Sequence, residues 1–175
     1  MEIILGYNEH IHESDEGGWR PSRIPSFEDL DYVIGPDGTT YDVKFILAVV
    51  NHASDLLTQL TEGTINEYLA ALPIIYTFDV PTFATDGKYT YVNPGFVMTL
   101  LERCEGSVIG IAFVLMHEVY HNLFMHHQRE ERDPVHFDDH DKANAAQDYE
   151  INWVIEHSFP DMRDPRAVKE EDPDL

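Results

Sequence analysis

Hydrophobic residues recur at helical spacing along two long stretches of the chain, and shorter β-prone stretches lie between them. The first helix is predicted to begin near Tyr41, where the apolar stripe consists of Phe45, Ile46, Val49, Val50, Ala53, Leu56, Leu57 and Leu60. A second, short helix is predicted over 64–71. After Pro73, the sequence Ile-Ile-Tyr-Thr-Phe at 74–78 predicts a strand.

The segment 81–92 has the pattern of a β-hairpin. Asp86-Gly87 favours the positive φ that tight hairpin turns need, and the second arm, Tyr89, Thr90 and Tyr91, is rich in β-prone residues. Asn93 followed by Pro94 is a favourable start for a helix, which is predicted to run to about residue 103.

The longest apolar run, 108–116, predicts a buried helix that ends between His127 and Arg132, before Pro134. A last helix is predicted from Lys142 to about Glu156, before Pro160.

Three regions follow from this pattern. Residues 1–40 are rich in Gly, Pro, Ser and acidic residues and predict an irregular arm with one short strand at 3–6. Residues 41–157 would form the folded domain, and 158–175 an acidic tail.

The end of the apolar run carries His-Glu-Val-Tyr-His at 117–121. Residues four apart on a helix face nearly the same direction, so His117 and His121 can bind one metal ion together. The pattern His-Glu-x-x-His is typical of a zinc site in which the glutamate, here Glu118, takes a proton from a water that the metal acidifies. The preceding apolar residues predict that this helix is buried.

A catalytic zinc site needs a third protein ligand, and the last predicted helix offers one. Its core-facing stripe mixes polar with apolar residues: Asn144, Asp148, Ile151, Asn152 and Ile155. Buried polar groups cost free energy unless they are paired, and a zinc ion with its histidines would pair these. At gluzincin-like spacing, Asp148 would bind the metal and Asn152 would accept the second ring N–H of a ligand histidine.

His126 and His127 are alternative third ligands. His127 follows His117 by ten residues, as in the metzincin pattern, but that pattern has glycine where this chain has Phe124. On a straight helix, neither His126 nor His127 would reach the metal. We therefore expect both at the surface near the helix end, and prefer Asp148 as the ligand.

These segments together resemble the putative metallopeptidase domain of bacterial and phage proteins, which is often found ahead of a von Willebrand A-like domain. The resemblance covers about 70–156. The matching residues, in the family's order, are Ala84-Thr85-Asp86-Gly87, Tyr91-Val92-Asn93-Pro94, His117-Glu118-Val119-Tyr120-His121, His126, Arg132-Asp133-Pro134 and Asn144-x-Ala146-x-Asp148-Tyr149-x-Ile151-Asn152.

The resemblance implies an α+β, zincin-like fold, in which a small sheet lies over an active-site helix and a ligand-bearing helix. It also implies one Zn²⁺ per chain, bound by His117, His121 and Asp148, and hydrolysis of peptide bonds in a peptide or protein substrate. Asn144 and Asn152 would support the ligands.

Two further roles are expected on this interpretation. The arm from Lys88 to Val92, with Tyr89, Thr90 and Tyr91, would be an edge strand that holds the substrate by main-chain hydrogen bonds. Tyr120 and Tyr149 are candidates to stabilise the oxyanion.

Charge and cysteine content bear on partners and location. The 33 acidic and 11 basic residues give a net charge of −22, which repels nucleic acids and anionic membranes. The single cysteine, Cys104, excludes an intrachain disulfide, and the N-terminus lacks the pattern of a signal peptide. We expect a protein of the bacterial or phage-infected cytoplasm, or of a virion, without nucleic-acid or membrane partners.

The charge also supports an alternative function: a non-enzymatic acidic phage protein, a DNA mimic or an assembly protein, with a structural zinc ion. The acidic residues, however, concentrate in the first 31 residues, the loop 129–141 and the tail. Since the chain ends soon after its last helix, a stand-alone phage or prophage product is expected. Glu118 favours the enzyme, because a structural zinc ion needs no base.

Overall fold

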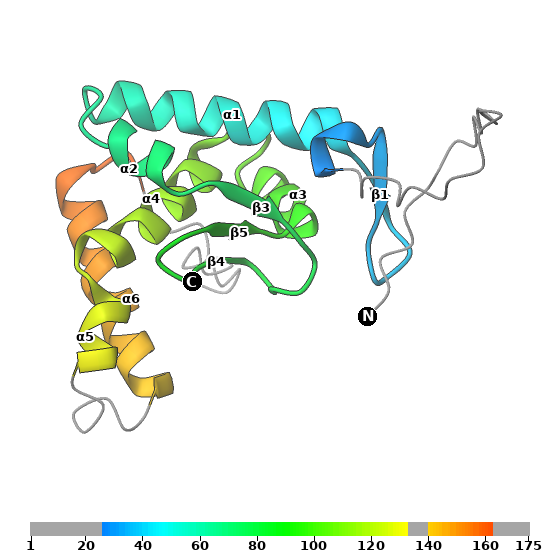
Figure 1. Ribbon diagram of the computed structural model, residues 1–175. Helices are drawn as coiled ribbons and strands as arrows, with labels where there is room; N and C mark the ends of the chain where they lie inside the picture. Colours follow the sequence, from blue (N-terminus) through cyan, green and yellow to red (C-terminus); the bar gives the residue numbers. More distant parts are fainter. Residues whose placement is uncertain (1–25, 133–139, 163–175) are drawn as a thin grey trace, which may run out of the picture.

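The structure is α+β, with helices packed around one small sheet and a separate β-hairpin near the start of the described chain (Figure 1). The computed structural model describes residues 26–132 and 140–162. In chain order the elements are η1 (Phe27–Asp29), β1 (Tyr32–Ile34), β2 (Thr40–Asp42), α1 (Val43–Leu60), α2 (Asn66–Ala71), β3 (Ile74–Tyr76), β4 (Phe83–Thr85), β5 (Thr90–Val92), α3 (Pro94–Arg103), α4 (Ile109–Leu123), α5 (His126–Arg132) and α6 (His140–Ser158).

Helix α4 forms the centre of the core. Every residue from Gly110 to Val119 is buried, and the helix packs against α1, α3, α5, α6 and strand β4. The apolar face of α1, including Ile46, Val50 and Leu57, belongs to the same cluster of buried side chains. The apolar run before the histidine motif therefore places the motif inside the protein, as the sequence predicts.

The sheet has the strand order β3-β5-β4, with β3 parallel and β4 antiparallel to β5. The hairpin turn is as predicted: Gly87 has φ +83°, and the Asp86 carboxylate accepts hydrogen bonds from the backbone N–H groups of Lys88 and Tyr89. The prediction that the arm from Lys88 to Val92 is an edge strand is wrong. Because β3 pairs with β5 from the other side, β5 is central and β4 is the edge beside α4.

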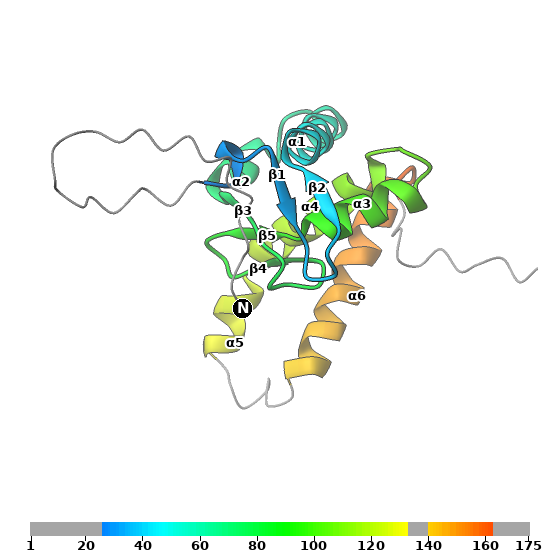
Figure 2. The same ribbon diagram turned by 90° about the vertical axis from the view of Figure 1, so that its right-hand side faces the viewer.

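The helix that carries the histidine motif ends earlier than predicted. It stops at Leu123, Met125 adopts the left-handed φ of +56°, and α5 begins at His126. The N–H of Met125 bonds to the carbonyl of Asn122, which closes the last turn. The sequence 117–132 contains no glycine or proline that would predict this break. Helix α5 and the first half of α6 both lie below the sheet in the view of Figure 2.

The predicted irregular arm contains regular structure that the composition does not reveal. Strands β1 and β2 pair antiparallel, with Val33 opposite Tyr41, and Val33 is buried against the body of the protein. The strand predicted at 3–6 and the tail from 163 onward lie outside the described residues. Among the helices of the described ranges, none has the length and apolar character needed to cross a membrane.

Candidate metal centre

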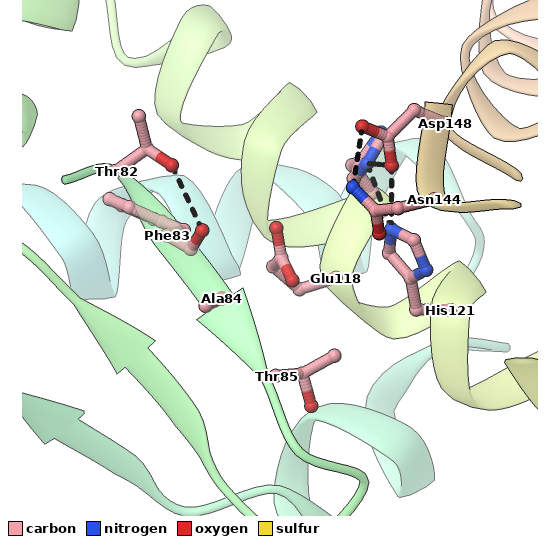
Figure 3. A pocket seen from close by; sticks show the side chains of 9 residues that line it. Thr82, Phe83, Ala84, Thr85, Glu118, His121, Asn144 and Asp148 are labelled. Carbon is pink, nitrogen blue, oxygen red and sulfur yellow. Dashed lines mark hydrogen bonds and ion pairs between the residues drawn. The ribbon is translucent and has the colours of Figure 1, made fainter. Parts of the chain in front are cut away.

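Three side chains from two helices converge on one point beside β4 (Figure 3). His117 Nε2 and His121 Nε2 of α4 lie 3.1 Å apart. Asp148 Oδ1 of α6 lies 3.2 Å from the first of these nitrogens and 3.1 Å from the second. The helix spacing brings the two rings onto one face of α4, and the packing of α6 on α4 brings the carboxylate to them.

The polar residues of α6 meet this cluster in part: Asp148 and Asn152 reach it, whereas Asn144, predicted to face the core, is exposed. Asn152 Oδ1 lies 2.8 Å from His117 Nδ1, and because a carbonyl oxygen only accepts, the ring nitrogen donates. In its neutral form, His117 therefore directs a lone pair from Nε2 into the cluster. Asn144 lies at the exposed side, where its Nδ2 is 3.5 Å from Asp148 Oδ2.

The Asp148 carboxyl is the acidic member of the cluster. Its partial burial would raise its pKa, but hydrogen bonds and electrostatic attraction from His117 and His121 outweigh burial and hold the pKa well below its usual range. In the neutral tautomer that Asn152 favours, by contrast, His117 Nε2 donates no such hydrogen bond, and the Asp148 carboxylate faces a ring nitrogen with a lone pair. Such an arrangement is stable when a positive charge lies between them.

The donor set fits a divalent metal ion. The three candidate ligand atoms, one from each residue, lie within 4.8 Å of one another. Two ligands about 2.0–2.1 Å from a tetrahedral zinc ion lie about 3.3 Å apart, close to the separations of these atoms. Two imidazoles and one carboxylate are also one of the donor sets found in catalytic zinc sites, which leave the fourth position open.

The cluster opens into a pocket of about 190 Å³. One wall is the edge strand and its preceding residue, Thr82 to Thr85, and the other consists of His117, His121, Asn144 and Asp148. Glu118 is only 6% exposed, yet it lines this pocket between the strand and the cluster (Figure 3). A carboxylate is therefore placed where a water and a substrate carbonyl could meet the three candidate ligands.

A comparison with models of protein families shows which family the chain is related to. Residues 63–166, more than half of the chain, match the model of a putative metallopeptidase domain. The protein belongs to this family. Among curated proteins and among solved structures, none matches the chain.

Within this metallopeptidase-family domain, several predicted site residues lie away from the pocket. Tyr149 is 76% exposed on α6, and Tyr120 packs with Phe124 against the core. Neither lines the pocket, so the structure does not support either as an oxyanion stabiliser.

The three residues of the predicted substrate strand are also displaced from the pocket. Tyr89, Thr90 and Tyr91 lie in or beside the central strand β5, behind β4, and Thr90 is buried. The wall that they were expected to form is supplied by Thr82 to Thr85 instead.

His126 is not the surface histidine that a straight helix predicts. The break at Met125 turns its ring into the protein, where it is 1% exposed and its Nδ1 lies 3.0 Å from His121 Nδ1. It is not a member of the cluster of candidate ligands. The side chain of His127 lies outside the described residues.

Sequence reasoning misses two contributors to the pocket region. The edge strand β4 is identifiable only from its pairing, because either arm of a hairpin can be outermost. Asn122 links the two sides of the region: its Nδ2 donates to Thr85 Oγ1 at 3.1 Å and to the carbonyl of Glu118 at 3.0 Å. Asn122 follows Glu118 by four residues on the same helix, so the two share a face, and this spacing is the sequence signal that could have placed Asn122 beside Glu118.

Proposed function

We propose that the protein is a zinc-dependent peptidase of the zincin-like type, with His117, His121 and Asp148 as ligands and Glu118 as general base. The observation that carries the proposal is the convergence of two ring nitrogens and a carboxylate, at hydrogen-bond distances, in a pocket that also contains Glu118. Membership of the metallopeptidase family supports it.

Zinc bound by two histidines and a carboxylate supplies Lewis acidity, which acidifies water and polarises a carbonyl group. The chain's own base is the Glu118 carboxylate. It would take the proton from the attacking water and deliver it to the nitrogen of the leaving amine. Burial of Glu118 beside the cluster keeps competing solvent away from that proton.

The edge strand β4 supports a peptide as the substrate. The carbonyl of Thr82 accepts from the N–H of Asn93, and the N–H of Asp86 donates to the carbonyl of Tyr89, so even-numbered positions pair with β5. By alternation, the backbone groups of Phe83 and Thr85 face away from β5. An extended peptide could pair with this outer edge, which would place its carbonyl groups beside Glu118.

The decisive experiment replaces Glu118 with glutamine, which keeps the shape and removes the base. Glu118→Gln should retain one zinc ion per chain and the melting temperature of the wild type. It should lose peptide cleavage by about 10²–10⁴-fold, the usual contribution of a general base. Atomic absorption measures the zinc content, and thermal melting measures the stability. Mass spectrometry detects the cleavage of a denatured protein substrate.

Asp148→Ala is the companion variant, and it should lose zinc because a ligand is removed. If the wild type binds zinc but cuts no peptide, and Glu118→Gln behaves like the wild type in every assay, the peptidase assignment is wrong. A structural zinc ion would then be the better interpretation.

A further inference from the structure

His126 lies directly behind one of the candidate ligands. The end of α4 at Leu123 and the left-handed backbone of Met125 turn the chain, so that the first residue of α5 faces back toward α4. The His121 and His126 rings meet edge to face, with their centroids 5.1 Å apart. The ring of His126 is almost completely buried.

The two rings meet through a defined pair of atoms. His121 Nε2 faces the candidate metal centre, 3.1 Å from Asp148 Oδ1, whereas His121 Nδ1 lies 3.0 Å from His126 Nδ1. The two nitrogens of an imidazole direct their bonds to different sides of the ring. His126 therefore lies on the side of His121 away from the centre and is poorly placed to bind the same ion.

The hydrogen-bond chemistry assigns a direction to this contact. A neutral imidazole has one donor and one acceptor nitrogen, so a ring that offers the Nε2 lone pair to a metal carries its proton on Nδ1. His121 then donates from Nδ1 to the Nδ1 lone pair of His126. The proton of His126 is left on Nε2, which faces the Glu150 carboxylate at 4.0 Å.

We propose that His126 is the positioning residue for His121, and that it fixes the tautomer and the orientation of this ligand by accepting the proton-bearing Nδ1. The inference rests on the metal site proposed above. Asn152 Oδ1 has the same relation to His117, at 2.8 Å. Each candidate ligand histidine thus has an acceptor behind it, and such partners set ligand basicity and metal affinity.

Two substitutions separate the acceptor from the ring. His126→Asn keeps an acceptor oxygen at the place of Nδ1 and loses the ring, whereas His126→Phe keeps a ring and loses the acceptor. If His126 positions His121, zinc affinity should fall about 10–100-fold in His126→Phe and stay close to wild type in His126→Asn. A residue that acts only by filling space predicts the reverse order. His52→Phe, at an exposed position of α1, is the control and should bind zinc as the wild type does.

Zinc affinity is measured by competition with a chromophoric chelator. The long-range ¹H–¹⁵N spectrum of the zinc-loaded protein supplies a second measurement. It should place the His121 proton on Nδ1, in slow exchange with water, in the wild type and in His126→Asn. In His126→Phe this proton should exchange rapidly.

Four outcomes would overturn the positioning role: equal zinc affinity in His126→Phe and the wild type, equal weakening in both His126 variants, a His121 proton on Nε2, or no zinc binding by the wild type. The last outcome would overturn the proposed function as well. Zinc binding in the expected order without any peptide cleavage would overturn the proposed function alone.

Discussion

Hydrogen bonds at the outer ring nitrogens hold the two candidate ligand histidines before any metal binds. His117 Nδ1 bonds to Asn152 Oδ1, and His121 Nδ1 meets His126 Nδ1. Both ligand rings are also buried, so their rotamers are fixed by packing. Ordering these side chains costs conformational entropy during folding, and little of that cost is left for metal binding.

The contribution of Asn152 can be tested against its neighbour on the same helix. Asn152→Ala should weaken zinc binding about 10–100-fold, because His117 loses the acceptor that fixes its ring. Asn144→Ala should have a much smaller effect, since Asn144 is exposed and its contact with Asp148 is long. Chelator competition on the two variants measures the difference. Similar affinities in both would contradict the role given to Asn152.

The placement of individual site residues follows from sequence where the geometry is local. His117 and His121 share a face because they are one helical turn apart, and Asp148 and Asn152 are found by the polar positions in an apolar stripe. His126 could not be placed in this way. Its position depends on one backbone angle at Met125, and methionine gives no signal of a positive φ.

Helices were easier to predict than the order of the strands. The stripe of α1 and the Asn93-Pro94 start of α3 are local signals, and both helices are confirmed, although Phe45 and Leu60 of the predicted stripe are exposed. Asn93 Oδ1 accepts from the N–H groups of Gly95 and Phe96. Strand β5 is central because β3 also pairs with it, and the paired residues, such as Ile74 and Thr90, lie 16 positions apart in the sequence. Only the turn of the β4–β5 hairpin is encoded locally, so its outer arm could not be identified.

The break between α4 and α5 is the element most open to mutation. A left-handed conformation costs an L-residue about 1–2 kcal/mol, and a β-branched residue tolerates it least. Met125 already carries this strain, so Met125→Val should lower the free energy of unfolding by the additional cost of a β-branched residue, about 1 kcal/mol, and weaken zinc binding by moving His126. Met125→Gly should retain zinc binding and should not lower the free energy of unfolding, because glycine adopts positive φ without strain. Urea unfolding and chelator competition measure the two effects.

Met98→Val is the matched control. Met98 is also partly exposed, but it lies within helix α3, where a β-branched residue costs only about 0.5 kcal/mol. If Met125→Val and Met98→Val unfold at the same urea concentration, the backbone strain assigned to the break is absent.

The proposed metal would connect two helices that are distant in sequence. Ile151 and Ile155 anchor the second half of α6 in the core, while Lys142, Asn144 and Tyr149 in the first half are exposed. Asp148 ties this region to the histidines of α4. A metal ion bound here would therefore stabilise a part of α6 in which these side chains contribute little apolar burial.

Removing zinc with a chelator should destabilise the whole protein and loosen this region first. Stabilisation by a ligand that binds only the folded state is about 4 kcal/mol when its free concentration is 1,000 times Kd. Without zinc, backbone amides of 144–149 should exchange with deuterium faster, while those of 111–115 in α4 should change little. Thermal melting and hydrogen exchange, each with and without chelator, provide the test. Unchanged exchange at 144–149 would show that the ion does not secure α6.

The strand beside the pocket belongs to a hairpin that contributes none of the candidate ligands. Its turn, 86–89, is exposed, and the Asn122–Thr85 hydrogen bond fastens its outer arm, β4, to α4, the helix that carries Glu118. Sequence changes in the turn can therefore accumulate without displacing the candidate ligands or Glu118. For protein engineering, the same separation makes the turn a place where the sequence can be varied without altering the candidate metal centre.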